Sequence, residues 1–465
     1  MGFTFQQDTI CAIATPVGDG GIGIIKLSGL DSLSIVLKLF RPRRPIASFE
    51  SHRLYYGTIL DPATAKAIDE VLLSYMAAPH SYTCEDVVEI NCHSGYAVLN
   101  RVLELVLQAG ARLAEPGEFT RRAFLNGRID LSQAEAVVDI IRSRSEQSLL
   151  LASSHLQGAL RSNVESWRET LLQVQAEIEA HIDFADDLDG DSPDDSFILE
   201  RFRNEIVDPL KTALSSYERG RIIREGLTIA LVGKPNVGKS SLLNALLGRD
   251  RAIVTSTPGT TRDVIEDSFI LAGVQVRILD TAGIRHEPDE IESMGIERTK
   301  KSVTEADLIL WLIDRSAPLT PEDEAVHQII ASARYFPILN KSDLPPFIFP
   351  AEVAERFNCA APILDLSTRF PSDIDRLRVF LSENFLNHPV EASRSMILAN
   401  LRHKECLERA LASSLQACSL LTVHGDFELI SMELLSARRE LESILGLECD
   451  DELLDHIFSR FCIGK

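Results

Sequence analysis

The residues with the clearest chemistry form a glycine-rich motif in the middle of the chain. Gly233-Lys-Pro-Asn-Val-Gly238-Lys239-Ser240 matches G-x-x-x-x-G-K-[ST]. The apolar run LTIALV precedes it and the helical run SLLNALLG follows it, so the loop joins a strand to a helix N-terminus. In such a loop, backbone N–H groups surround a β-phosphate, the lysine reaches the β- and γ-oxygens, and the serine holds Mg²⁺. The motif predicts a nucleotide site.

Two later motifs indicate which nucleotide binds. Asp280-Thr-Ala-Gly283 ends the run VRIL, where a carboxylate can point toward the Mg²⁺ shell and a backbone N–H toward the γ-phosphate. Asn340-Lys-Ser-Asp343 ends the run YFPIL. The carboxylate of Asp343 can accept hydrogen bonds from N1–H and the 2-amino group of guanine, and adenine offers neither donor. The predicted nucleotide is therefore GTP.

The segments between and after these motifs concern hydrolysis and base contact. The polar stretch TSTPGTTRD at 255–263 occupies the place of a switch I loop, in which one threonine can complete the Mg²⁺ shell. Ile284 follows DTAG where Ras-like proteins carry a water-positioning glutamine, and an aliphatic side chain cannot orient water. Hydrolysis is then either slow or dependent on another group. Ser367 and Thr368 lie where a third guanine-contacting loop belongs, although LST departs from the usual SA(K/R).

The spacing of apolar residues predicts the elements that must position these groups. Short β-like runs fill residues 1–118, together with one helix from Gly95 to Ala109. Apolar residues recur at helical spacing over 119–224 and 386–465, and strands alternate with helices over 225–385. We expect an α+β N-terminal domain and an all-α helical domain into which an α/β P-loop GTPase domain is inserted. Two adjacent helical domains are the alternative.

Composition limits the classes of partner and the compartment. With 47 Lys+Arg against 69 Asp+Glu among 465 residues, the net charge is -22, which argues against an extended nucleic-acid groove. The eight cysteines form no C-x-x-C pair, so neither a zinc site nor a disulfide scaffold is indicated. The first residues, MGFTFQQDT, carry no export or lipid signal pattern. These features predict a cytoplasmic protein.

Sequences at both ends of the chain, read with the central motifs, resemble the MnmE (TrmE) family of tRNA modification GTPases. The matching segments are DTICAIATPVGDGGIGIIKLSG, PGEFTRRAFLNGRIDLSQAEAVVDII, DTAGIRHEPDEIESMGIERT and the terminal FCIGK. The resemblance implies a homodimer that works with an FAD-dependent MnmG-type protein in a heterotetramer. Together they would add an aminomethyl-type (carboxymethylaminomethyl) group to C5 of the wobble uridine of certain tRNAs, using a tetrahydrofolate one-carbon unit.

The resemblance also assigns residues in the GTPase domain. It implies a K⁺ ion at a dimer interface, taking the place of an arginine finger, and a catalytic glutamate, Glu292, that orients the attacking water. Mg²⁺ would be held by Ser240 and Thr261, and K⁺ by Asn236, Thr255, Thr257 and Thr260. The full set expected at GTP is Asn236, Val237, Gly238, Lys239, Ser240, Ser241, Thr255, Ser256, Thr257, Pro258, Gly259, Thr260, Thr261, Asp280, Thr281, Ala282, Gly283, Asn340, Lys341, Asp343, Ser367 and Thr368.

In the N-terminal domain the resemblance implies a folate site of the aminomethyltransferase type. The positions that match the family's contacts are Lys26, Glu89, Arg128 and the terminal Lys465. A carboxylate can accept from pterin donors, and cations can meet the tail carboxylates of a 5-formyl- or 5,10-methylene-tetrahydrofolate. The family pattern has Arg and Lys where this chain has Lys26 and Arg128, which keeps the charges. Cys462 in the tail is a candidate for chemistry, and a structural role is equally open.

Other patterns are rejected or kept as rivals. The stretch 18–23 fits G-x-G-x-x-G, but a β-like run follows it, so a hairpin turn is expected. The aspartate-rich stretch 183–195 fails the EF-hand pattern and is expected to be a solvated connector. The rival function is a regulatory or ribosome-assembly GTPase, like Era and Der, without one-carbon chemistry. The net charge further predicts that tRNA is bound mainly by the partner protein.

Overall fold

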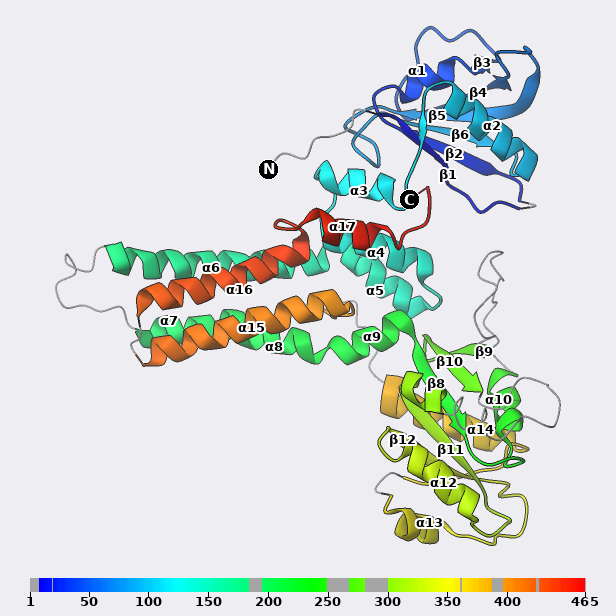
Figure 1. The fold of residues 1–465 in the computed structure, drawn as a ribbon, viewed down its shortest axis with the longest axis vertical. Coiled ribbons are helices and arrows are strands. Elements are labelled where there is room, and N and C mark those ends of the chain that lie inside the picture. Colours follow the sequence, from blue (N-terminus) through cyan, green and yellow to red (C-terminus); the bar gives the residue numbers. More distant parts are fainter. Residues whose placement is uncertain are drawn as a thin grey trace. The chain divides into compact units, whose positions relative to one another are not determined.

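The computed structural model describes residues 8–18, 20–183, 195–248, 267–280, 300–359, 362–386, 396–423 and 426–464. The chain divides into two compact units (Figure 1). Unit 1 comprises Met1–Val138, His155–Val207 and Arg409–Lys465, and unit 2 comprises Asp139–Ser154 and Asp208–Glu408.

Unit 1 begins with a seven-stranded sheet in the order β3-β4-β5-β6-β2-β1-β7. All of its pairings are antiparallel except that of β1 with β7. The strands are β1 (Ile10–Ile13), β2 (Gly23–Ser28), β3 (Phe40–Pro42), β4 (Arg53–Leu60), β5 (Ala67–Met76), β6 (Val87–Cys92) and β7 (Arg112–Leu113).

Two helices, α1 (Ser32–Leu37) and α2 (Tyr96–Gln108), form a core with one face of this sheet. Side chains alternate between faces along a strand, so Ile25, Leu27 and Ile90 enter this core. Their neighbours Lys26 and Glu89 lie on the opposite face, where antiparallel pairing of β2 with β6 makes them cross-strand partners. The fold thus brings two predicted ligand contacts side by side.

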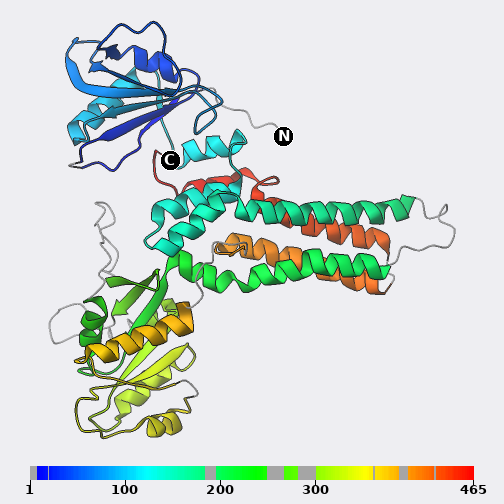
Figure 2. The same cartoon turned by 180° about the vertical axis from the view of Figure 1, so that it is seen from behind.

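The helices of unit 1 follow the sheet along the chain. α6 and α16 lie side by side over much of their length in both views (Figures 1 and 2). Leu131 and Ala134 of α4 pack with Leu454 and Phe458 of α17 in a smaller core. Besides α1 and α2, the helices with residues in this unit are α3 (Glu118–Leu125), α4 (Leu131–Arg142), α5 (Glu146–Leu156), α6 (Ala159–Asp183), α7 (Asp195–Phe202), the π-helix η1 (Arg203–Val207), α15 (Leu401–Thr422), α16 (Phe427–Leu445) and α17 (Asp451–Phe458).

Unit 2 contains a six-stranded sheet in the order β13-β12-β11-β8-β10-β9, with only β9 antiparallel to its neighbour. The chain moves from β8 to one side of the sheet and then returns to the other side at β11. That reversal places the loop after β8 at a topological switch point, where open α/β sheets bind ligands. The strands are β8 (Leu227–Val232), β9 (Asp267–Leu271), β10 (Val274–Asp280), β11 (Leu308–Asp314), β12 (Tyr335–Asn340) and β13 (Leu364–Asp365).

Helices cover both faces of this sheet, which explains why β8 is buried along its whole length. α10 and α14 pack on one face, and α12 and α13 on the other. The helices and π-helix that lie wholly in unit 2 are α8 (Asp208–Ser215), α9 (Tyr217–Glu225), α10 (Lys239–Leu247), α12 (Pro321–Ile330), α13 (Pro350–Phe357), α14 (Pro371–Leu381) and η2 (Ser382–Leu386).

The predicted fold class is confirmed: an α+β N-terminal domain, a helical domain and an inserted α/β P-loop domain. The stretch 18–23 leads into β2, as the rejection of a dinucleotide fingerprint required. α1 and β3, of six and three residues, were not predicted. The acidic connector falls mainly outside the described residues. Within the described residues, no helix is long and apolar enough to cross a membrane.

Candidate nucleotide and ligand sites

The phosphate loop, here called the P-loop (residues 233–240), joins the end of β8 to the start of α10. Two glycines in it are required by close packing. A Cβ on Gly233 would overlap the carbonyl oxygen of Leu312 on β11, and one on Gly238, at φ 102°, would overlap Nδ2 of Asn340. The loop therefore lies directly against the two strands on one side of β8.

Lys239 is the lysine that the motif specifies in this loop, and it is only 9% exposed. Its Nζ donates to the carbonyl oxygens of Gly233 at 2.7 Å and Lys234 at 2.9 Å. The ammonium group is thus folded back over its own loop. Two carbonyls of the P-loop therefore hold it beside the helix N-terminus, where a phosphate is favoured.

Asn340 joins the P-loop to the base-recognition loops. Its Nδ2 donates to the Val237 carbonyl at 2.7 Å, and its Oδ1 accepts from the Thr368 backbone N–H at 3.3 Å. Because the side chain is 1% exposed, both of its ends are committed to protein partners. The predicted residues Val237, Asn340 and Thr368 are therefore brought together by one amide.

Asp343 follows Asn340 in the same motif, and two hydrogen bonds hold its carboxylate in place. Its Oδ1 accepts from Ser367 Oγ at 2.6 Å, and its Oδ2 accepts from Arg369 Nη1 at 3.1 Å. The hydrogen bond from Ser367 holds the pKa of Asp343 below 3.8 and outweighs the opposing effect of burial. The group is an anion at neutral pH, which suits a double donor such as the N1–H and amino edge of guanine. Lys341 Nζ binds Asp314 Oδ2 at 2.5 Å.

Some of the other predicted nucleotide contacts lie among the described residues, and the rest lie outside them. Asn236, at φ 62°, is exposed, as are Ser240 and Ser241 at the start of α10. Asp280 is the last residue of β10 and pairs with Leu231. The residues that lie outside the described part are Thr255, Ser256, Thr257, Pro258, Gly259, Thr260, Thr261, Thr281, Ala282, Gly283, Glu292 and Lys465.

A second cluster lies in unit 1, around an aromatic residue that the sequence did not single out. The Tyr82 ring lies beneath Lys26 Nζ, 4.5 Å from its centroid, and beneath the Arg128 guanidinium, 4.9 Å away. Lys26 Nζ is also 5.1 Å from the centroid of Phe119. Two of the predicted folate residues, far apart in the sequence, therefore share one tyrosine.

Tyr82 is fixed in a neutral state. Its hydroxyl lies 2.9 Å from Thr120 Oγ1, and burial raises the pKa of Tyr82 above 10. A neutral ring attracts cations through its quadrupole without cancelling their charge, as a carboxylate would. Lys26 and Arg128 thus keep positive charge near Tyr82 for an anionic ligand. A tyrosine beside this pair could have been noticed only by its contacts, because a pattern of spacing does not show them.

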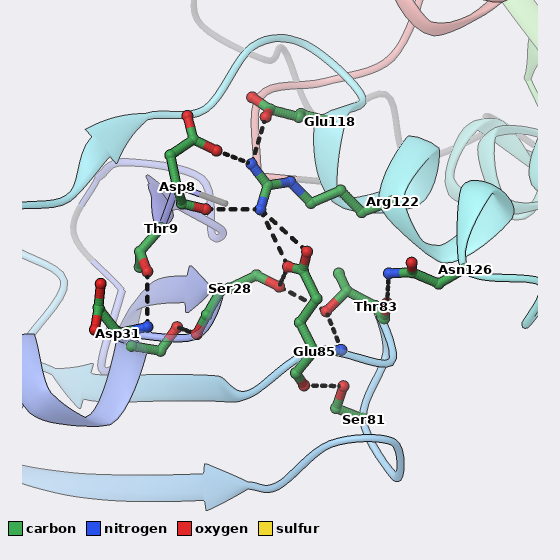
Figure 3. Close-up of polar contacts among 12 residues, drawn as sticks. Asp8, Thr9, Ser28, Asp31, Ser81, Thr83, Glu85, Glu118, Arg122 and Asn126 are labelled. Carbon is green, nitrogen blue, oxygen red and sulfur yellow. Dashed lines mark hydrogen bonds and ion pairs between the residues drawn. The ribbon is translucent and has the colours of Figure 1, made fainter. Parts of the chain in front are cut away.

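The loop that carries Tyr82 is held by a polar network (Figure 3). Thr83 Oγ1 lies 2.6 Å from Ser28 Oγ, which also donates to Glu85 Oε2 at 2.7 Å. Arg122 donates to Glu85 at 3.1 Å and to Asp8 Oδ1 at 2.8 Å. The Arg122 side chain is 7% exposed, so its charge is compensated by the partly buried carboxylates rather than by water. The loop is therefore a rigid support.

The C-terminal tail reaches the same sheet. Gly464, at φ 93°, lies so close to β1 that a Cβ would be 2.7 Å from the Ile13 carbonyl. The neighbouring residue of β1, Ala12, pairs with Lys26. Cys462 is exposed, and its carbonyl accepts from the Gly117 N–H at 3.5 Å. Gly464 thus lies close to the strand position of a predicted ligand contact.

The described residues contain no metal-binding cluster and no disulfide. Across these ranges, no group of three or more His, Cys, Asp or Glu side chains could hold a metal ion. The eight cysteines, all among the described residues, form no disulfide. The chemistry is therefore concentrated in the P-loop region and in the cluster around Tyr82.

A parallel sheet with a glycine loop at its switch point, a lysine in that loop and Asn340 and Asp343 at the end of β12 defines a P-loop GTP-binding protein. Comparison with known proteins identifies the family. The model of the MnmE helical domain matches residues 131–462, and that of the GTP-binding protein TrmE N-terminus matches residues 9–128. The chain belongs to the MnmE family of tRNA modification GTPases.

Full-length relatives give the same result. The chain is 59% identical to the tRNA modification GTPase MnmE of Syntrophobacter fumaroxidans, over 99% of this chain and 98% of that protein. It is 45% identical to MnmE of Carboxydothermus hydrogenoformans, over 99% of this chain and all of that protein. Among solved structures, the chain has partial similarity to the Y63A variant of Aquifex aeolicus Era bound to GDP and AlF₄⁻, with 30% identity over 40% of this chain and 66% of that chain and a TM-score of 0.27.

Proposed function

We propose that this chain is a K⁺-dependent GTPase that, with an FAD-dependent MnmG-type partner, adds an aminomethyl-type group to C5 of the wobble uridine of certain tRNAs. The observation that carries the proposal is the presence of two sites in one chain of this family. In the first site, Lys239, Asn340 and Asp343 are placed to bind phosphate and guanine. In the second site, Lys26 and Arg128 lie over the ring of Tyr82.

In the GTPase site, each described residue has a defined task. Lys239 would exchange its two carbonyl partners for phosphate oxygens, and Asp343 would accept the two guanine donors. Mg²⁺ would be held by Ser240 and Thr261, and Ser240 fits because it is exposed at the N-terminus of α10. A bound K⁺ would supply positive charge beside the phosphates, and Asn236, exposed on the P-loop, fits as one of its oxygen ligands.

In the second site, the donor set fits a tetrahydrofolate derivative. Glu89, the cross-strand partner of Lys26, would accept from pterin donors, and the cations Lys26 and Arg128 would meet carboxylates of the ligand. Tyr82 would keep the two cations in place while leaving them charged. The tail with Cys462 and Lys465 would complete the site, since Gly464 already lies against β1.

The proposed assembly rests on the resemblance to the family and on the charge of the chain. We propose a homodimer that forms a heterotetramer with the flavoprotein, with the tRNA gripped mainly by that partner because this chain carries a net charge of -22. GTP hydrolysis would gate the modification through domain movement rather than take part in its chemistry.

Two measurements on the full chain test these proposals. Calorimetric titration with 5-formyltetrahydrofolate should show binding, and its absence would favour a switch GTPase without one-carbon chemistry. GTP hydrolysis should be faster in KCl than in NaCl at equal ionic strength. Equal rates would contradict the K⁺ assignment, and with it the explanation of how Ile284 is tolerated.

A further inference from the structure

The P-loop contains a second lysine, at a position that its sequence motif leaves unspecified. Lys234 directly follows the first glycine, and its Nζ lies 2.7 Å from Oδ2 of Asp323 and 3.3 Å from Oγ1 of Thr320. Asp323 is in the first turn of α12, 89 residues further along the chain. The pair therefore connects the P-loop to a helix that is remote in sequence.

The ion pair is buried. The Asp323 side chain is 0% exposed and that of Lys234 is 13% exposed. Asp323 Oδ2 also accepts from the backbone N–H and hydroxyl of Thr320, at 2.9 and 3.0 Å, while Oδ1 has no hydrogen-bond partner among the described residues. A buried carboxylate is costly without a cation, so the P-loop is held where Lys234 can supply one.

The contact links the loop that leads into α10 to a helix on the opposite face of the sheet. The P-loop leads into α10, which packs on one face, whereas α12 packs on the opposite face. The carbonyl of Lys234 is one of the two that hold the Lys239 ammonium, at 2.9 Å. A shift of the Lys234 peptide would therefore move the support of the lysine that reaches the phosphates.

We propose that Lys234 and Asp323 form a positioning ion pair for phosphate binding, which fixes the P-loop against α12 and thereby places Lys239. Lys234 and Asp323 act through the backbone and through Lys239, without touching the nucleotide. This inference rests on the GTP site alone and is independent of the proposed folate and K⁺ roles.

The test uses the full chain and a neutral double variant, Lys234→Met with Asp323→Asn, which leaves no unpaired buried charge. The affinity for GDP is measured by displacement of a fluorescent GDP analogue, and the affinity for guanosine by ligand-observed NMR. We expect GDP binding to weaken about tenfold, equivalent to ~1.4 kcal/mol. Guanosine binding should stay within about twofold, because guanosine reaches only the base-recognition groups. The conservative Lys234→Arg variant should keep most of the GDP affinity.

A matched control lies near the start of β8, the strand whose other end leads into the P-loop. Arg221 Nη2 pairs with Asp307 Oδ1 at 2.7 Å, and Asp307 also accepts from the Thr228 N–H near the start of β8. The neutral control, Arg221→Met with Asp307→Asn, should lower the melting temperature without changing GDP affinity. Wild-type GDP affinity in the Lys234/Asp323 double variant, or an equal loss of guanosine affinity, would overturn the proposal. Failure of the wild-type chain to bind GDP would instead refute the GTP site itself.

Discussion

Asn340 donates its side-chain N–H to the carbonyl of Val237 at 2.7 Å, so a residue of the guanine motif holds the phosphate loop. The same amide accepts from the Thr368 backbone at its other end. Base recognition and phosphate binding are therefore mechanically joined through one buried side chain. The Asn340 side chain therefore belongs to both the base-binding and the phosphate-binding part of the nucleotide site.

Replacing Asn340 with Ala should affect both parts at once. The Val237 carbonyl and the Thr368 N–H would lose their partner, which costs about 1–3 kcal/mol for a buried polar group. We expect a lower free energy of unfolding in urea and GTP binding weakened by about tenfold or more. Asn384→Ala is the control, because its side chain makes an exposed hydrogen bond to the Phe380 carbonyl four residues earlier, near the end of α14. Undiminished GTP affinity in the Asn340 variant would disprove the coupling.

Asp343→Asn should change the base that is recognised. An amide offers one donor and one acceptor, so it matches the C2 carbonyl and N1–H of xanthine and mismatches the two donors of guanine. We predict that GTP binding falls by at least about 100-fold and that the variant prefers XTP. Competition between the two nucleotides measures this directly. A variant that still prefers GTP would show that Asp343 does not contact the base.

The network around Arg122 predicts the acid stability of unit 1. Burial raises the pKa of Asp8 and of Glu118, but hydrogen bonds from Arg112 and Arg122 outweigh it and hold the two pKa values below 3.8 and 4.5. Folded pKa values below the unfolded ones mean that this stabilisation is complete above about pH 5 and is lost as pH falls through the folded values.

Removing Arg122 should therefore shift acid unfolding upward. Arg122→Met leaves Asp8, Glu85 and Glu118 with less positive charge, which costs about 3–5 kcal/mol at neutral pH. It also raises the folded pKa values of Asp8 and Glu118, because both lose a hydrogen bond from Arg122. Circular dichroism against pH is the measurement, and the more exposed Arg161, paired with Glu165 on one helix face, supplies the control Arg161→Met. Coincident acid transitions in the wild-type and Arg122→Met chains would contradict this reading of the network.

Folate binding should depend on the ring of Tyr82 rather than on its hydroxyl. Tyr82→Phe keeps the face beneath Lys26 and Arg128 and should bind 5-formyltetrahydrofolate within about twofold of wild type. Tyr82→Leu removes two cation–π contacts of ~0.5–2 kcal/mol each, so we expect affinity to fall by about tenfold. Tyr96→Leu, at the exposed start of α2, is the matched control. Equal binding by the Phe and Leu variants would show that the ring has no such role.

Local motifs could be predicted from the sequence, and long-range contacts could not. Lys239, Asn340 and Asp343 could be singled out because each belongs to a motif that follows a strand with the spacing that nucleotide binding requires. Tyr82 and the pair Lys234–Asp323 have no such spacing, since their partners come from distant elements. Lys26 and Arg128 were assigned only through family resemblance, and the structure then placed both over Tyr82. The short elements α1 and β3 were missed because three to six residues hold too little periodicity.

The net charge predicts how tRNA binding divides between this chain and its proposed partner. With 69 acidic against 47 basic residues, the isolated chain should attract a polyanion only through local cations. We expect weak tRNA binding that falls steeply as KCl rises from about 50 to 200 mM, because each phosphate contact releases counterions. Adding the FAD-dependent partner should restore tight binding in the same filter-binding assay. Tight binding by this chain alone that resists salt would show that its own surface, rather than the partner's, holds the RNA.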